Sequence, residues 1–228
     1  MIVRNQGYAA VKLSSLPVDR SIDEMADSTD AVAFSYQDRG HQFYLLNFPT
    51  GGTAWGFDAA TGEWCERRYW YSAGNEWQAL RVQTYVLAFG VHLVGDRQTG
   101  KVYEMSKDSA LDVDGNGMRR LRRFMGLRGD NHRRVVYPRL EVVMQTGSAP
   151  SSGQGSAPVV MLRTSNDSGH SWTPERWASG GLRGHYAHRV FWTRLGAARD
   201  RVFELIVSDP LPWILTDCFA PGAAEGMN

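Results

Sequence analysis

Asp58-Ala59-Ala60-Thr61-Gly62-Glu63-Trp64 is a turn sequence that returns in altered form as Asp96-Arg97-Gln98-Thr99-Gly100-Lys101-Val102. The Asp, Thr and Gly of the two copies are each 38 residues apart. An Asp at the start of a turn accepts hydrogen bonds from the following backbone, and a Gly supplies the positive φ with which the chain enters the next strand. Each copy follows an apolar run and precedes a run that contains an aromatic residue. The sequence therefore predicts two hairpin tips.

A repeat of nearly 40 residues in a strand-rich sequence is typical of β-blades that are stacked or arranged around an axis. Four runs predict a four-stranded meander as a first blade: Ala31–Tyr36, Gln42–Phe48, Thr53–Asp58 and Trp64–Trp70. Four further runs predict a second blade: Trp77–Tyr85, Val86–Phe89, Val91–Gly95 and Lys101–Met105. The other interpretation is that two unrelated hairpins share a common kind of turn.

The predicted fold class is all-β, with β-propeller-like blades followed by a β-sandwich-like sheet. The predicted organisation is an N-terminal segment (1–30), blades (31–117) and a C-terminal β domain (118–228) that frays from Pro221. One helix is predicted to begin at a cap formed by Ser14 or Ser15, with Pro17 in its first turn and Asp19–Met25 after it. The strands predicted for the C-terminal domain are Tyr137–Thr146, Val159–Thr164, Trp172–Trp177, Ala187–Leu195 and Arg201–Ser208.

The composition excludes several classes of protein. The 228 residues can bury a substantial core, and 25 basic against 24 acidic residues create no overall field that would recruit nucleic acid or a membrane. The sequence contains no run of 18 apolar residues, so no membrane-spanning helix is predicted. The first residues lack the apolar region of a signal peptide. Cys65 and Cys218 are far apart and are predicted to be free thiols in a reducing compartment.

Residues Ser165–Trp172 fit the Asp-box pattern S-x-D-x-G-x-S/T-W at every position. In this motif the Asp, here Asp167, accepts backbone hydrogen bonds across a hairpin tip. The Gly, here Gly169, adopts a left-handed conformation, and the Trp, here Trp172, packs beneath the turn. Asp-boxes occur in sialidases, but they lie away from the substrate there. Together with Asp58, Gly62, Asp96 and Gly100, these residues are therefore predicted to be structural turn residues.

The sequence predicts no catalytic, cofactor-binding or metal-binding residue, and no cofactor. Residues Asp112–Gly117 match the first half of a calcium loop, but Arg123 stands where the loop needs a bidentate Glu. The six histidines form no metal-binding pattern, and no nucleophile or nucleotide-binding motif is present. The protein is predicted not to be an enzyme. A carboxylate pair without a motif, such as Asp200 with Glu204, stays open.

An arginine-rich segment, Met118–Arg139, carries eight arginines and one acidic residue, Asp130. Its densest part consists of Arg119, Arg120, Arg122 and Arg123. These guanidinium groups could contact the phosphates of DNA in a channel. They could equally form a solvated face, or a subunit interface with the acidic segment Asp19–Asp38, and the sequence does not choose between these readings.

The order of several segments resembles a bacteriophage family. The segments are Gly40–Pro49, Thr53–Asp58, Thr61–Trp64, Val159–Leu162, the Asp-box, Gly184–Tyr186, Arg189–Gly196, Arg201–Glu204 and Ser208–Pro210. Between about residue 30 and residue 220 they are similar to the packaged-DNA-stabilization protein of short-tailed bacteriophages, also called the tail hub, nozzle or tail accessory factor. Members of this family are about twice as long, with more β-rich sequence ahead of the matching part.

This resemblance implies a virion structural protein with propeller-like blades. It implies a ring of copies, expected to be a hexamer, below the portal and its adaptor, which seals or lines the DNA channel and carries fibres, spikes or a needle. The expected location is the virion tail, assembled in the host cytoplasm. Packaged DNA is an expected non-specific partner, and no membrane is expected.

A two-blade stack is expected to leave an exposed face at each end, so a second chain is expected to supply missing blades. Trp70 and Trp192 are expected to contribute to contacts between chains. The alternative function is that of a carbohydrate-active or glycan-binding β-propeller, either sialidase-like or a lectin-like tail module.

Overall fold

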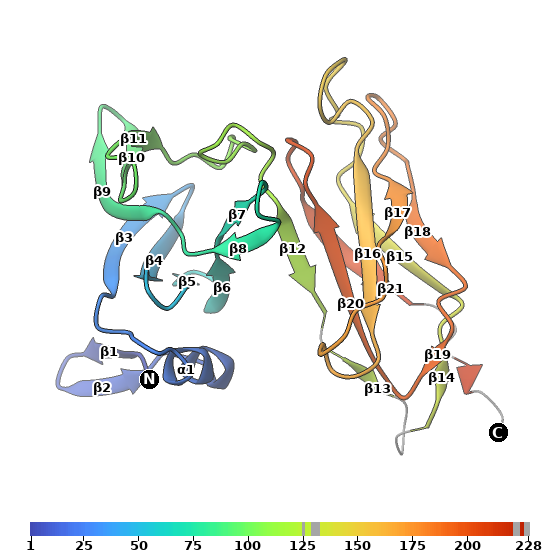
Figure 1. Ribbon diagram of the computed structural model, residues 1–228, viewed down its shortest axis with the longest axis horizontal. Helices are drawn as coiled ribbons and strands as arrows, with labels where there is room; N and C mark the ends of the chain where they lie inside the picture. The colour runs from blue at the N-terminus through green and yellow to red at the C-terminus, as the bar shows by residue number, and fades with distance from the viewer. Residues whose placement is uncertain (125, 129–132, 221–223, 226–228) are drawn as a thin grey trace. The chain divides into compact units, whose positions relative to one another are not determined.

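Strands make up nearly all of the regular structure in a computed structural model that describes residues 1–124, 126–128, 133–220 and 224–225 (Figure 1). The predicted all-β class is confirmed. The chain divides into two compact units, Met1–Lys107 and Asp108–Asn228, whereas the sequence places the boundary between residues 117 and 118. Asp130 and most of the tail from Pro221 lie outside the described residues. No helix in the described part is long and apolar enough to cross a membrane.

The first unit contains one helix and eleven strands in its described residues. They are β1 (Val3–Gln6), β2 (Ala9–Lys12), α1 (Leu16–Asp23), β3 (Val32–Asp38), β4 (His41–Phe48), β5 (Thr53–Asp58), β6 (Glu63–Arg67), β7 (Tyr69–Tyr71), β8 (Glu76–Gln78), β9 (Val82–Ala88), β10 (Val91–Asp96) and β11 (Val102–Glu104). The order β3-β4-β5-β6 forms one antiparallel sheet and β11-β10-β9 another, and β1-β2 and β7-β8 are separate hairpins.

The predicted first meander is confirmed, and the predicted second one is wrong in its strand count. Strand β9 runs without a break to Ala88, so the second sheet has three strands rather than four. The break expected near Val86 is absent because the hairpin turn is formed by Phe89 and Gly90. The run Trp64–Trp70 also divides, into the end of the first sheet and the start of the β7-β8 hairpin.

The two meanders contact each other through aromatic faces. Phe34 of β3 stacks on Tyr85 of β9 with ring centroids 5.1 Å apart. In the first sheet, Phe34 pairs with Leu45, which pairs with Gly56, so these three residues lie on the same face. In the second sheet, Tyr85 pairs with Val94 and lies on the same face as it. Gly56 and Val94 are equivalent under the 38-residue repeat, so the sheets meet through equivalent faces. Radial repetition would instead set the front of one blade against the back of the next. The propeller-like arrangement is therefore not confirmed.

The predicted helix forms over Leu16–Asp23 and ends two residues before Met25, its predicted last residue. Ser15 occupies the N-cap position, but its side chain makes no capping hydrogen bond. The neighbouring Ser14 is buried and donates to the carboxylate of Asp19 at 2.5 Å, and Lys12 Nζ lies 2.6 Å from the same carboxylate. These bonds, from Lys12 first and then from Ser14, lower the pKa of Asp19 to about 2. The helix is thereby fastened to the β1-β2 hairpin.

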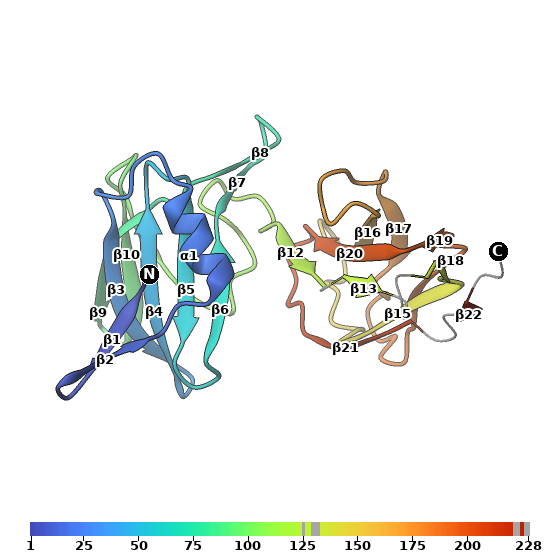
Figure 2. The ribbon, with the colours of Figure 1, turned by 90° about the horizontal axis from the view of Figure 1, so that it is seen from below.

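Helix α1 covers the outer face of the first meander, in front of β5 and β6 in Figure 2. The indole nitrogen of Trp55 donates to Ser21 Oγ at 3.3 Å, and that of Trp64 donates to the carbonyl of Leu13 at 3.1 Å. Val18 is buried on the inner side of the helix. The expectation that the outer face of the first meander is exposed is therefore wrong, because residues 13–21 cover it.

The second unit is a β-sandwich. Its strands are β12 (Arg120–Arg123), β13 (Leu127–Arg128), β14 (Val135–Val136), β15 (Arg139–Met144), β16 (Val159–Ser165), β17 (Arg176–Ser179), β18 (Val190–Thr193), β19 (Ala197–Ala198), β20 (Asp200–Val207), β21 (Leu215–Phe219) and β22 (Ala224–Glu225). One sheet has the order β12-β20-β16-β17, with β13 also on β20, and a second has the order β18-β15-β21. A small sheet, β19-β14-β22, lies at one end.

The core of the sandwich is formed by the facing side chains of its two main sheets. Leu162 and Phe203 from one sheet share a buried cluster with Leu140 and Trp192 from the other. Trp192 is 4% exposed, and its indole nitrogen donates to the carbonyl of Arg176 at 2.9 Å. The expectation that Trp192 contributes to contacts between chains is therefore wrong, because this side chain packs inside its own unit.

Candidate functional site

The two repeated turns have the same hydrogen bonds. In each, the Asp carboxylate accepts from the backbone N–H two residues later, at 3.0 Å for Asp58 and 2.8 Å for Asp96. It also accepts from the hydroxyl of the Thr three residues later, at 3.1 and 2.7 Å. The Gly donates its N–H to the carbonyl oxygen of the Asp, and φ is +75° at Gly62 and +66° at Gly100. All four residues act as turn residues in this geometry.

Each of these aspartates also binds a basic side chain from earlier in the chain. His41 Nδ1 lies 2.7 Å from Asp58 Oδ2, and the guanidinium of Arg81 binds the carboxylate of Asp96 with both Nε and Nη2. Burial acts to raise the pKa of both carboxyls, but the hydrogen bonds outweigh it and the net pKa of each is lowered. The carboxylates therefore fasten a hairpin tip to a preceding strand or loop.

The Asp-box forms the turn after β16. Asp167 Oδ1 accepts from the backbone N–H of Ser171 at 2.9 Å, and the hydroxyls of Ser165 and Ser171 donate to the same carboxylate at 2.6 and 2.5 Å. Gly169 has φ +98°, and the Trp172 ring lies next to its Cα. Strand β17 begins only at Arg176, so the strand predicted from Trp172 starts four residues too early. Asp167 is engaged in holding the turn.

Replacing Asp167 by Asn is expected to weaken the acid sensitivity of the second unit. The Ser165 hydroxyl, with the Ser171 hydroxyl and N–H, holds the pKa of Asp167 well below its usual range. A carboxyl with a lowered pKa in the folded state stabilises that state above its unfolded pKa of about 4, and the contribution is lost as the pH falls below that value. Urea unfolding at pH 6 and pH 2.5 should therefore show a smaller difference in Asp167→Asn than in the wild type. The exposed Asp23→Asn should keep the wild-type difference.

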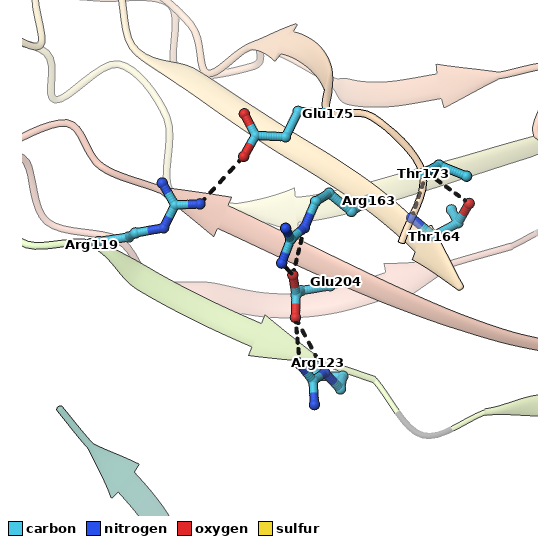
Figure 3. A network of polar contacts seen from close by, with 7 residues as sticks. All are labelled: Arg119, Arg123, Arg163, Thr164, Thr173, Glu175 and Glu204. Carbon is cyan, nitrogen blue, oxygen red and sulfur yellow. Dashed lines mark hydrogen bonds and ion pairs between the residues drawn. The ribbon is translucent and has the colours of Figure 1, made fainter. Parts of the chain in front are cut away.

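The densest set of charged contacts surrounds Glu204 on the outer face of the β12-β20-β16-β17 sheet (Figure 3). Glu204 is fully buried, although it lies in the middle of strand β20. Arg123 of β12 binds Glu204 Oε2 with Nη2 at 2.7 Å and Nε at 3.2 Å. Arg163 of β16 binds Oε1 with Nε at 2.8 Å and also with Nη2. We call Arg123, Glu204 and Arg163 the arginine clamp.

The arginine clamp is joined to the Asp-box by Trp172. The guanidinium carbon of Arg123 lies 4.9 Å from the centre of a Trp172 ring, and that of Arg163 lies 5.4 Å away. A guanidinium within about 6 Å of an indole face is attracted by the ring's quadrupole. The tryptophan under the Asp-box turn thus packs on both cations that hold Glu204. The turn and the clamp form one connected structure.

Three of the four arginines singled out in the sequence bind groups of their own unit. Arg123 belongs to the clamp, and Arg119 Nη2 lies 3.3 Å from Glu175. Arg120 donates to the carbonyl oxygens of Asp209 and Leu211 at 2.6 and 2.5 Å, and burial lowers its pKa. Each of these side chains reaches a different strand or loop. They attach the edge strand β12 to the sandwich.

Arg122 differs from its three neighbours on and next to β12. Its side chain is exposed, and it makes no hydrogen bond or ion pair within the part of the chain that the structure describes. Of the four predicted contact residues, Arg122 is therefore the one whose guanidinium is available to a partner.

The sequence predictions did not include Arg163 or the role of Glu204. A single Glu inside the apolar run Val202–Val207 is a signal that could have identified a buried, paired carboxylate. The pair Asp200 and Glu204 is also accounted for: Arg128 lies 3.0 Å from Asp200, and both oxygens of Glu204 accept from arginines. Both carboxyl groups are held by arginine side chains, so neither is free to approach a substrate as a general acid must.

The segment that matches half of a calcium loop forms a tight turn. Asp114 accepts from the backbone N–H of Asn116 at 3.0 Å and from its side-chain amide at 2.8 Å, and Gly115 has φ +79°. Among the described residues, no three His, Cys, Asp or Glu side chains come together as metal ligands.

Comparison with known protein families gives a match that falls on the sandwich. Residues 121–222 match the model of a family described as Bacteriophage P22 Gp10, beta-sandwich. The second unit is similar to that family. The match begins in β12, extends past β21 and includes both the arginine clamp and the Asp-box. It supports a tail protein of a short-tailed bacteriophage and a place in the virion tail. A search of curated protein sequences found no match to the chain.

Proposed function

We propose that this chain is a non-enzymatic structural component of a bacteriophage tail hub or nozzle. Copies of it would form a ring, expected to be a hexamer, below the portal and its adaptor. The ring would seal or line the DNA channel and would carry fibres, spikes or a needle. The observation that carries the proposal is the match of the sandwich to the P22 Gp10 family over residues 121–222.

The native mass of the assembly, measured with its co-purifying chains, tests this proposal. A ring of copies together with other tail proteins is the expected result. A monomer that hydrolyses sialosides or other glycans, and loses that activity when Glu204 or Asp200 is replaced, would favour the glycosidase alternative instead. Engagement of both carboxylates by arginines supports the non-enzymatic proposal.

The proposal includes a second chain that completes the β-structure of the first unit. One outer face of the paired meanders is covered by α1, but the outer face of the β11-β10-β9 sheet carries exposed Val102, away from the β9-β10 turn. Natural proteins rarely leave an apolar sheet face open to solvent. Co-purification of one further β-rich chain with the ring is the expected result.

For packaged DNA, we propose Arg122 as the contact, because its side chain is exposed and makes no hydrogen bond or ion pair among the described residues. In the assembled ring, Arg122→Glu should weaken binding of duplex DNA, measured by fluorescence anisotropy against salt concentration. Loss of one phosphate contact per subunit should reduce the salt slope by about one per site. The control is Arg97→Glu at an exposed hairpin tip of the other unit. Equal losses in both variants would contradict a channel position for Arg122.

A further inference from the structure

The β9-β10 hairpin ends in a tip that is both uncharged and exposed. Residues 82–95 contain no Asp, Glu, Lys or Arg, whereas charged residues make up 21% of the chain. At the tip, which we call the apolar hairpin (residues 86–91), Phe89 is 98% exposed, and Leu87 and Val86 are more than half exposed. Side chains on both faces of the hairpin thus reach solvent.

The turn of the apolar hairpin has a residue that its backbone disfavours. Phe89 has φ +55° and Gly90 has φ +77°, the signs of a two-residue type I′ turn. Such turns prefer Asn-Gly or Asp-Gly, and a bulky residue at positive φ is an outlier. Phe89 is 98% exposed, so no packing against the described residues compensates for this conformation. A residue that keeps a disfavoured backbone conformation without any gain in stability is typical of functional positions.

The surroundings of the apolar hairpin have the anatomy of an interface. Leu93 lies opposite Val86 across β9 and β10, and on its other side it lies opposite Glu104 of β11. The opposite charge is carried by exposed Lys107, which follows β11 at the same end of the sheet as the tip, where Met105 donates its N–H to the carbonyl oxygen of His92 at 2.8 Å. An uncharged apolar centre with a rim of both charge signs matches the pattern found at protein–protein contacts.

We infer that the apolar hairpin is a contact between copies of this chain, with Phe89 as its anchor. Two uncharged surfaces can pack together without burying an unpaired charge. Around them, the acidic side chains of one copy can pair with the basic side chains of the other. A rigid aromatic side chain at the tip of a fixed turn loses little entropy on binding. This inference rests on the proposed ring of copies and names the surface that joins them.

A lipid surface is the less favoured occupant. No cationic side chain lies between residues 82 and 95 to meet anionic headgroups. Burial of the turn in hydrocarbon would also leave its backbone polar groups without partners. A protein contact can supply those hydrogen bonds.

The test compares Phe89→Asn with Arg39→Asn in the full chain. Arg39-Gly40 forms the equivalent turn between β3 and β4, with φ +50° and +84°, so both variants create Asn-Gly in the same backbone geometry. Sedimentation velocity over a range of concentrations measures association. Phe89→Asn should weaken self-association at least tenfold and should melt no lower than the wild type. Arg39→Asn should associate within twofold of the wild type.

The possible outcomes separate this inference from the proposed ring. Undiminished association of Phe89→Asn would overturn the hairpin contact and leave the ring standing. A Phe89-dependent dimer that forms no ring would support the contact and contradict the ring. A wild type that stays monomeric at all concentrations would overturn the inference. Binding of the wild type, but not of Phe89→Asn, to phosphatidylcholine–phosphatidylglycerol vesicles in place of self-association would also overturn it.

Discussion

Replacing Glu204 by Gln is expected to lower the free energy of unfolding of the second unit by about 3 kcal/mol. Glutamine keeps the shape of the side chain but removes the charge that both Arg123 and Arg163 bind. Breaking a buried ion pair on one side costs about 3–5 kcal/mol because the remaining charges stay desolvated. Arg123 and Arg163 are 53% and 29% exposed and can regain some hydration, so the lower end of that range is expected.

Urea unfolding followed by tryptophan fluorescence measures this effect. The control is Arg122→Gln, which removes an exposed guanidinium from β12, next to Arg123, and should change stability by less than about 0.5 kcal/mol. Arg123→Gln and Arg163→Gln, each combined with Glu204→Gln, give the coupling between the charges. A Glu204→Gln variant as stable as the control would mean that the clamp contributes nothing to the fold.

Replacing Asn47 by Leu is expected to destabilise the first unit by roughly 2 kcal/mol. Asn47 is 1% exposed, and its amide nitrogen donates to the carbonyl oxygens of Leu80 and Val82 at 3.0 and 2.8 Å. These two bonds tie β4 to the start of β9 and so connect the two meanders. Leucine has a similar volume but no donor, and it would leave the carbonyl oxygens of Leu80 and Val82 without this partner.

Hydrogen exchange read by mass spectrometry localises the effect of Asn47→Leu. Faster exchange is expected in β4 and β9, with little change in the second unit. The control is Gln37→Leu, which replaces an exposed amide on β3. If both variants exchanged alike, the two hydrogen bonds of Asn47 could not be what joins the sheets.

Features set by neighbouring residues could be predicted from the sequence. The turns at Asp58 and Asp96 depend on an Asp, a Thr and a Gly within five residues, so their chemistry is visible in a short stretch. The four-stranded first meander follows for the same reason, since clear turn residues separate its strands. The second meander was misjudged because the alternation through Tyr85–Phe89 contains no strong turn signal before Phe89-Gly90.

Features set by distant residues could not be predicted. Glu204 is held by Arg123, which is 81 positions away in the sequence, and by Arg163, which is 41 positions away. No local pattern links the three side chains. The arginine-rich segment was recognised, but its sequence does not distinguish Arg122, which is exposed, from Arg120, which binds the carbonyls of Asp209 and Leu211. The two side chains lie on the same face of β12, so strand alternation does not separate them, and only the distant carbonyl groups of residues 209 and 211 do.

The contact of the two meanders through equivalent faces limits how this unit can grow. When the front of each repeat packs on the back of the previous one, a gene can lengthen the array by duplication, because every new copy meets the same kind of surface. Here Phe34 and Tyr85 bring the like faces together, so the pair is saturated and a third repeat would find no matching site. A circular structure built from this unit must therefore obtain its symmetry from separate polypeptides and not from tandem repeats within one.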